Sequence, residues 1–339
     1  MMSAPTLGII LDGDAEQLRR SAAAFHATPV DQDTRDWDCA PIGRRRTTLA
    51  GEVSVTGPGT FLGRAARTLT FGPSLTDGWW FDRSDLADQL PIRVSTSNVW
   101  TTARNIVLRS GSPHNYMRMV EHIIALKLGM NLDNVVIQME SGDPPLFDRG
   151  SMDLVEAVER AGIVELDEDV PRFTVREPVT IGDARGGFLT CYPDEAGRGT
   201  LQVDCAIDFR TAIGRQRLRT TVTPETFRHG AQARTNTTFA RMLFTKTVGK
   251  LFADVRNLGY TTRNILIAGR FGYFNEPKLI QDGKSLEAVW HRSMMDLVAA
   301  LSLMDEGRFV GGVDSYKAGH TLDVLLLKRL HRDGLFVRV

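Results

Sequence analysis

Residues 47–72 read TTLAGEVSVTGPGTFLGRAARTLTFG, and this stretch decides the fold class. Apolar and polar residues alternate along both of its arms, and β-branched residues are frequent, as is typical of β-strands. Gly57-Pro58-Gly59 lies between the arms and predicts a hairpin turn. It is not followed by the Gly-Lys-Ser/Thr of a phosphate-binding loop. The stretch therefore predicts antiparallel strands, and we expect further strands in residues 91–108.

Helices follow these strands. The segment 114–129 (HNYMRMVEHIIALKLG) comes after Ser112-Pro113, a helix-start pair, and stops at Gly129, a residue favoured at helix ends. Its apolar residues lie almost all round the helix, so we expect the helix to be buried. Beyond the strand NVVIQM, a second helix is predicted at 152–161, before Gly162.

The order of elements recurs after an acidic segment, 161–179 (AGIVELDEDVPRFTVREPV), which holds a proline and leads into new strands. New strands, a long helix at 285–304, another strand and a last helix at 321–332 follow. We therefore predict an α+β protein with two similar domains, domain I at 46–168 and domain II at 169–339.

Residues 1–45 show only weak strand patterning, and we interpret them as an N-terminal extension. One short helix from Asp14 to Phe25 is expected there, with Asp14 as its N-cap.

The composition excludes several classes of protein. The 339 residues hold 41 Lys and Arg and 41 Asp and Glu, so the net charge is zero, which argues against a nucleic-acid partner. The cysteines, Cys39, Cys191 and Cys205, form no CxxC pair, which favours a reducing compartment. No segment has the apolar length of a signal peptide or a membrane span. We expect a cytoplasmic protein without stable membrane insertion; the sequence does not indicate its oligomeric state.

Three histidines stand in contexts that suggest chemistry. Glu121-His122 lies in the buried helix, His291 precedes Asp296 by five residues, and His320 ends YKAGH. Two histidines and a carboxylate form a catalytic zinc site that leaves one position for water. Zinc lowers the pKa of that water to about 7, and a nearby glutamate can then accept its proton. A single histidine in a helix is nevertheless more often a hydrogen-bonded core residue.

Taken in order, several short motifs resemble one family, the zinc-dependent UDP-3-O-acyl-N-acetylglucosamine deacetylases of lipid A biosynthesis. The resemblance runs from about Arg46 to His331, and YKAGH is its most specific part. The other motifs are MVEH (119–122), LDNVVI (132–137), PLFD (145–148) with Gly150-Ser151, IDF (207–209) and ART (233–235).

The resemblance implies a role for each matching residue. His122, His291 and Asp296 correspond to ligands of Zn²⁺, and Glu121 to the general base. His320 matches the histidine that assists as an acid or electrostatic stabiliser, and Thr235 the threonine that contacts the tetrahedral intermediate. Arg292 and Lys317 are the implied substrate-binding residues. The implied fold has, in each domain, a β-sheet with helices on one face; helices pack between the domains and the active site lies at their junction.

Four positions depart from the family pattern. The family's zinc histidine and aspartate are four residues apart, an offset of roughly 40° around a helix, whereas five residues give roughly 140°. His291 and Asp296 can therefore share an ion only if the helix holds a bulge, such as a π-bulge. Ala300 stands where the family has an acid that orients the catalytic histidine, which leaves Asp314 or Asp323 as candidate substitutes. The other two departures are Phe61 for a histidine in the hairpin and Arg292 for a lysine.

These observations favour a zinc amidohydrolase that removes the N-acetyl group from a UDP-N-acetylglucosamine, possibly 3-O-acylated. The alternative is a divergent homologue that keeps the fold, has lost or altered catalysis, and binds a nucleotide sugar or a protein partner. A related amidase with another substrate is the third possibility.

Overall fold

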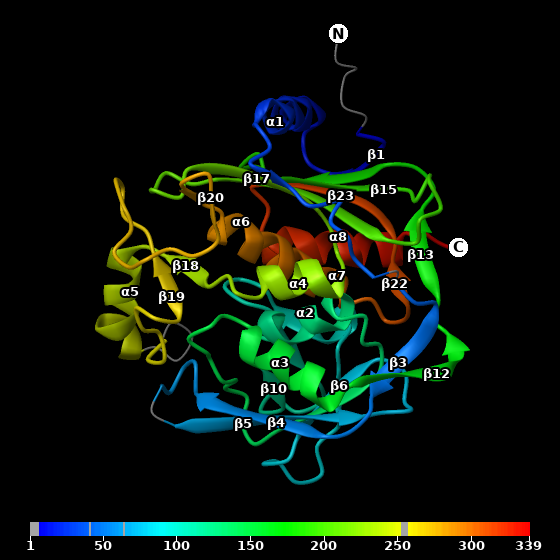
Figure 1. The fold of residues 1–339 in the computed structure, drawn as a ribbon, viewed down its shortest axis with the longest axis vertical. Helices are drawn as coiled ribbons and strands as arrows, with labels where there is room; N and C mark the ends of the chain where they lie inside the picture. The colour runs from blue at the N-terminus through cyan, green and yellow to red at the C-terminus, as the bar shows by residue number, and fades with distance from the viewer. Residues whose placement is uncertain (1–6, 41, 64, 252–256) are drawn as a thin grey trace.

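The computed structural model describes residues 7–40, 42–63, 65–251 and 257–339. The fold is α+β, as predicted, and is built in layers (Figure 1). From top to bottom in that view, α1 lies above a seven-stranded sheet, two layers of helices follow, and a five-stranded sheet closes the molecule below. The helices are therefore covered by a sheet on each side.

The lower sheet contains the predicted hairpin as two of its five strands, β4 and β5. Its order is β4-β5-β11-β6-β7, with β4 antiparallel to β5 and Pro58 opposite Ala66. Gly57 and Pro58 therefore lie within β4. The turn follows them, whereas the sequence predicted it at Gly57-Pro58-Gly59. The bounds are β4 Val53–Pro58, β5 Ala66–Pro73, β6 Trp79–Arg83, β7 Ile92–Arg93 and β11 Val135–Met139.

The upper sheet has the order β1-β14-β15-β23-β16-β17-β2. Its inner face carries buried apolar residues such as Val203 and Cys205, which join the main core with the helices. The bounds are β1 Ile9–Asp12, β2 Gln32–Asp33, β14 Val179–Gly182, β15 Phe188–Tyr192, β16 Leu201–Asp208, β17 Arg215–Thr221 and β23 Gly311–Tyr316.

The N-terminal segment adds to this upper sheet. β1 pairs in parallel with β14 at one edge, and β2 pairs in parallel with β17 at the other. Between them α1 (Ala15–Ala27) begins after Asp14, which caps it as expected by accepting from the Gln17 N–H. Phe25 packs with Phe188 and Tyr316 in a small core on the outer face of the sheet. Residues 1–6 and 41 lie outside the described residues.

The helices between the sheets pack closely. α2 (Glu121–Gly129) is buried nearly all round, as its sequence predicts, and lies against α7 (Val298–Leu301). Lys127 of α2 donates from Nζ to the carbonyl oxygens of Ser302 and Met304, just beyond α7. The other helices are α3 Met152–Ala161, α4 Pro224–Gly230, α5 Phe239–Lys246, α6 Glu287–His291 and α8 His320–Arg332, with 3₁₀ turns at Thr96–Asn98 and Val248–Leu251.

Small sheets complete the fold. They are β8-β9-β10 (Val99–Thr101, Val107–Arg109, Tyr116–Met117), β3-β12 (Arg45–Leu49, Ile163–Asp169) and β22-β13-β24 (Arg308–Phe309, Arg172–Val175, Phe336–Arg338), with the pairs β18-β19 (Thr235–Thr237, Ile265–Ile267) and β20-β21 (Ile280–Gln281, Lys284–Ser285). The chain leaves β12 at Asp169 and enters β13 at Arg172, within the segment interpreted as the joint.

Two helix predictions need correction. The helix expected from His114 begins only at Glu121, because Tyr116–Met117 pairs with β9 and Met119 has a positive φ of 50° that a helix does not accept. The long helix expected over 285–304 begins at Glu287 and is interrupted by a π-helical segment, η3 (Arg292–Leu297), before α7.

Candidate active site

Elements from both parts of the chain meet between the sheets. Glu121 and His122 form the first turn of α2, whereas His291 ends α6, Asp296 lies in the π-helical segment, and His320 begins α8. Thr235 begins the short strand β18. The structure thus brings together six of the residues predicted from the sequence.

His122 and His291 point their Nε2 atoms at one another, 3.5 Å apart. Both atoms lie at hydrogen-bond distance from the Thr235 Oγ1, at 3.1 Å and 3.0 Å. At its other end His122 Nδ1 is 3.1 Å from Ser151 Oγ, and Ser151 directs its own hydrogen to the Met295 sulfur. Ser151 Oγ therefore accepts from His122 Nδ1–H, which leaves the Nε2 lone pair of His122 facing the shared centre.

The π-helical segment explains how a five-residue spacing keeps two side chains together. One extra residue in a regular helix would turn Asp296 away from His291. The wider π turn absorbs that residue, and Asp296 Oδ1 lies 3.5 Å from His291 Nδ1. Met295, four residues after His291, is buried and contacts Ser151.

The charges of the site are coupled. Burial raises the pKa of Glu121 to about 7, although it accepts a hydrogen bond from the Ile106 N–H. Burial and the neighbouring His291 lower the pKa of His122 to about 3, so this ring is neutral at physiological pH. Burial alone would raise the pKa of Asp296, but His320 and His291 outweigh it, and the net shift is downward.

His320 faces the two carboxylates. Its Nε2 lies 3.7 Å from Asp296 Oδ1 and 3.8 Å from Glu121 Oε1. Burial works against the charged ring, but Asp296 and Glu121 overcome this, so the pKa of His320 is raised. The site therefore contains two histidines whose neutral form is favoured, beside a third histidine whose charged form is favoured by the two carboxyl groups.

A buried ion pair lies behind His320. Arg292 Nη2 donates to Asp323 Oδ1 at 2.5 Å and to Ser315 Oγ at 3.1 Å. Asp323 is one turn from His320 on α8, and its buried Oδ2 and the buried Nδ1 of His320 have no hydrogen-bond partner among the described residues. Of the two candidates to replace the acid missing at Ala300, Asp323 lies here, whereas Asp314 accepts from Tyr192 on the outer face of the upper sheet.

Two hollows open onto these residues, with volumes of about 560 and 210 Å³. Both are lined by His291, Asp296 and His320. The larger also contains Arg292 and Lys317, and Lys317 forms an ion pair with Asp208 at 2.8 Å. The smaller contains Glu121 and Thr235, with Phe61 at its edge under the Arg118 guanidinium.

Sequence reasoning missed part of the lining. Both hollows also include Arg104, Asn236 and Arg241, and the smaller includes Tyr260. Asn236 was accessible from the sequence because it directly follows Thr235, but the other residues carry no local signal.

The donor set fits a zinc ion in its chemistry. Two imidazoles and one carboxylate are ligands that zinc takes in catalytic sites, and the buried Asp296 Oδ1 has no hydrogen-bond partner in the described part of the chain. In these side-chain conformations, however, Asp296 approaches Nδ1 of His291 rather than the Nε2 atoms, and no three His, Cys, Asp or Glu side chains of the described residues enclose a metal position.

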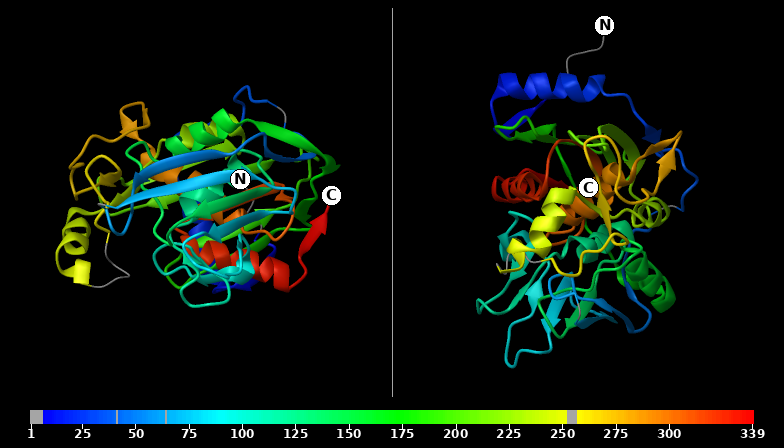
Figure 2. Two further views of the ribbon diagram at one scale, coloured as in Figure 1. Left: turned by 90° about the horizontal axis from the view of Figure 1, so that it is seen from below. Right: turned by 90° about the vertical axis from the view of Figure 1, so that its left-hand side faces the viewer.

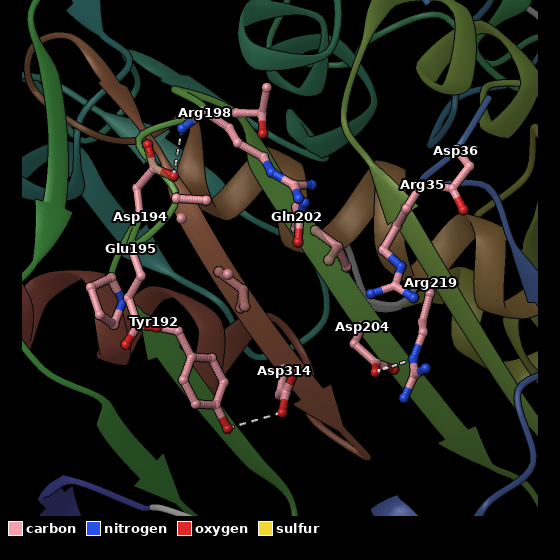
Figure 3. A pocket seen from close by; sticks show the side chains of 17 residues that line it. Arg35, Asp36, Tyr192, Asp194, Glu195, Arg198, Gln202, Asp204, Arg219 and Asp314 are labelled. Carbon is pink, nitrogen blue, oxygen red and sulfur yellow. Dashed lines mark hydrogen bonds and ion pairs between the residues drawn. The ribbon is translucent and has the colours of Figure 1, made fainter. Parts of the chain in front are cut away.

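A third hollow, of about 590 Å³, lies elsewhere, on the outer face of the upper sheet beside Arg35 (Figure 3). Several of its polar groups are bonded to protein partners. Asp204 accepts from both Arg217 and Arg219, and Tyr192 donates to Asp314 at 3.0 Å. Of the candidates named from the sequence, only Asp314 lines it, and none of the residues assigned to metal binding, catalysis or substrate binding does.

Comparison with known proteins shows the family of the chain. The family model for UDP-3-O-acyl N-acetylglycosamine deacetylase matches residues 46–332. The chain belongs to this family, and hence to the deacetylases among the hydrolases.

Curated relatives span nearly the same length. The chain is 26% identical over 295 residues to the UDP-3-O-acyl-N-acetylglucosamine deacetylase of Solibacter usitatus, which covers 86% of the chain and 92% of the relative. It is 28% identical over 291 residues to the enzyme of the same name from Brucella ovis, which covers 84% and 95%. None of the helices within the described ranges is long and apolar enough to cross a membrane.

Proposed function

We propose that this chain is a zinc-dependent deacetylase that hydrolyses the N-acetyl group of a 3-O-acylated UDP-N-acetylglucosamine, as in lipid A biosynthesis. One observation supports it above the others. The π-helical segment keeps Asp296 beside His291, which in turn faces His122, and within the described residues the Asp296 Oδ1 has no hydrogen-bond partner. A regular helix would have favoured the divergent homologue without catalysis.

His122, His291 and Asp296 would hold the zinc, which when bound acidifies a water molecule and polarises the amide carbonyl. Glu121 accepts a proton from the attacking water, and its pKa near 7 suits a general base at neutral pH. His320, charged beside Asp296 and Glu121, stabilises the developing oxyanion and can protonate the leaving amine. The Thr235 hydroxyl donates a hydrogen bond to the same oxyanion.

The larger hollow suits the sugar nucleotide. Lys317 stands in it, and its partly exposed pair with Asp208 can be exchanged for a phosphate at little cost. Arg292 borders the same hollow, but its buried guanidinium is bound to Asp323 and Ser315, so we assign it mainly to the support of the site.

Metal analysis and acetate release together test the proposal. The purified chain is expected to hold one zinc per chain, to release acetate from UDP-3-O-acyl-N-acetylglucosamine, and to lose turnover on chelation and regain it with zinc. His122→Ala and Asp296→Ala should each lose both zinc and turnover. His331→Ala is the matched control because this histidine is exposed and its ion-pair partner, Asp305, does not belong to the site.

Two outcomes would overturn the proposal. A chain that binds the UDP-sugar but holds no zinc and releases no acetate is the divergent homologue. If His122→Ala keeps full zinc and turnover, the metal site has been assigned to the wrong residues.

A further inference from the structure

Residues 239–251 and 257–274 form a lobe that projects from the side of the molecule (Figure 1). The lobe contains α5 and β19, and Figure 1 shows it at the left edge, next to β18; Figure 2 shows α5 at the outer limit of the molecule. Only Thr245 of α5 is buried, so this helix packs little against the body. An amphipathic helix with so little cover needs another surface for its apolar side chains.

Large apolar side chains of the lobe face outward. Phe271 is 90% exposed, and Leu251, Phe274, Leu243, Phe239 and Phe244 are each between 46% and 76% exposed. Phe239 of α5 stacks on Phe274, with ring centroids 5.0 Å apart, which joins the helix to the loop that carries Phe271. Singly exposed apolar residues are ordinary, but this concentration in one lobe is not.

The lobe is also strongly basic. Residues 239–251 and 257–274 contain five Lys and Arg and no Asp or Glu, whereas the whole chain has no net charge. Of the cations whose side chains the structure describes, Arg241 lines the hollow and Arg263 is paired with Asp148, which leaves Lys246 and Arg270 for the outer surface. The exposed Arg270 guanidinium lies over the ring of Phe271, 5.2 Å from its centroid, so a cation and an aromatic ring share the tip of the loop. Basic and aromatic side chains together are typical of surfaces that bind the interface of an anionic membrane.

The same helix borders the active site. Arg241 and Thr245 line the 210 Å³ hollow that contains Glu121 and Thr235, while Leu243 and Phe244 of α5 are exposed. A surface that covered the outside of α5 would therefore lie next to this hollow.

We propose that this lobe, through its described residues, docks the protein reversibly on an anionic lipid surface, with Phe244 and Phe271 entering the interface and Lys246 and Arg270 meeting the lipid phosphates. The exposed side chains are too few for insertion, and the positive charge selects anionic over zwitterionic lipid. The inference does not depend on zinc or on turnover, and it is tested without substrate.

Another exposed residue supplies a matched control. Leu75, at 87% exposed, lies between β5 and β6 in the lower sheet, and its neighbour Asp77 is acidic. Leu75 is nearly as exposed as Phe271 but lacks the basic surroundings. Leu75→Asp therefore changes an exposed apolar residue outside the lobe.

Vesicle co-sedimentation of the full chain tests the proposal, with vesicles of phosphatidylcholine alone and vesicles that also contain phosphatidylglycerol. We expect binding only to the second kind, weakened as salt rises. Phe244→Asp with Phe271→Asp should reduce the partition coefficient at least about tenfold. Loss of one cation, as in Arg270→Gln, should reduce it by roughly fivefold. Leu75→Asp should bind as the wild type does, and unchanged melting curves show that all the variants fold.

Three results would overturn the proposal. The first is that the wild type does not bind vesicles that contain phosphatidylglycerol. The second is that the variant with both Phe244→Asp and Phe271→Asp binds as well as the Leu75→Asp control. In the third, the chain binds no vesicles but self-associates in sedimentation velocity, and the lobe substitutions abolish this; the lobe then covers a second copy of the chain.

Discussion

Two hollows of nearly equal volume, 560 Å³ between the helices and 590 Å³ on the outer face of the upper sheet, differ in how their polar groups are bonded. In the outer hollow Asp204 and Asp314 each have protein partners, and no buried side-chain nitrogen or oxygen lining it lacks one among the described residues. Around the inner hollow, four residues have buried atoms that form no hydrogen bond within the described part of the chain: Asp296, His320, Asp323 and Arg292.

The difference teaches that size does not identify the active site. Burying a polar atom without a hydrogen bond costs free energy, so a fold keeps such atoms where a ligand satisfies them or a reaction uses them. Among the described residues, the buried polar side-chain atoms that line the outer hollow all have hydrogen-bond partners, and several of those around the inner hollow do not. The predictions below test this contrast.

The largest effect is expected at Glu121 of the inner hollow. Glu121→Gln keeps the size of the side chain but removes the proton acceptor, so turnover should fall by about 10²–10⁴-fold. Zinc content and substrate binding should be unchanged. A variant that keeps wild-type turnover would show that another group accepts the proton.

The buried Arg292–Asp323 pair should affect both activity and folding. Asp323→Asn leaves a buried guanidinium uncompensated, which should lower the free energy of unfolding by about 3–5 kcal/mol, measured by urea titration. It also removes the charge one turn from His320, and turnover should fall by about 10–100-fold with little change in KM.

A double variant separates these two effects. Arg292→Met with Asp323→Leu replaces the ion pair by apolar side chains, so we expect most of the lost stability to return while turnover stays low. If turnover returns together with stability, the pair is structural only and does not support His320.

The smallest effect on turnover is expected at the outer hollow. Burial, and then the charge of Asp204, raise the pKa of Asp314 from 3.8 to about 7. Because the folded chain holds this proton more tightly, the stabilisation is complete below about pH 4 and is lost as pH rises through about 7. The loss amounts to at most about 4 kcal/mol.

Asp314→Asn isolates that contribution because the amide stays neutral at every pH. The free energy of unfolding of the wild type should fall relative to the variant as pH rises through about 7, while turnover of the two proteins stays the same. A large loss of turnover in this variant would break the contrast between the hollows.

Much of the fold followed from local signals. Asp14, Gly162 and the apolar periodicity of 321–332 were enough to locate α1, the end of α3 and α8, because caps and periodicity act within a few residues. The start of α2 was placed seven residues too early. Ser112-Pro113 begins a turn and not a helix, because Tyr116 pairs with Arg109 in a small sheet.

The N-terminal segment shows the limit of such reasoning. Its strand β1 pairs with Val179–Gly182 and β2 with Arg215–Thr221, both more than 160 residues away. Two- and four-residue parallel strands carry too little pattern to predict such pairing. Their place at opposite edges of the upper sheet comes from tertiary contacts alone.

At the site, the sequence supplied the chemistry but not the arrangement. Glu121, His122, His291 and His320 were found through their motifs, and the bulge between His291 and Asp296 was foreseen as a condition for their meeting. The support of His320 was not determined, since Asp314 and Asp323 were equally open until the structure separated them. Arg241 and Tyr260 come from distant segments, so only the folded structure shows that they line the site.

The π-helical segment also bears on how such enzymes are searched for in genomes. A pattern that requires histidine and aspartate four residues apart rejects this chain, although the two side chains lie within 3.5 Å of one another. The five-residue spacing is accommodated by the π-helical segment Arg292–Leu297, which continues directly from α6 into α7. Searches that allow one extra residue at this position, and then ask for YKxGH downstream, would recover chains that a fixed spacing discards.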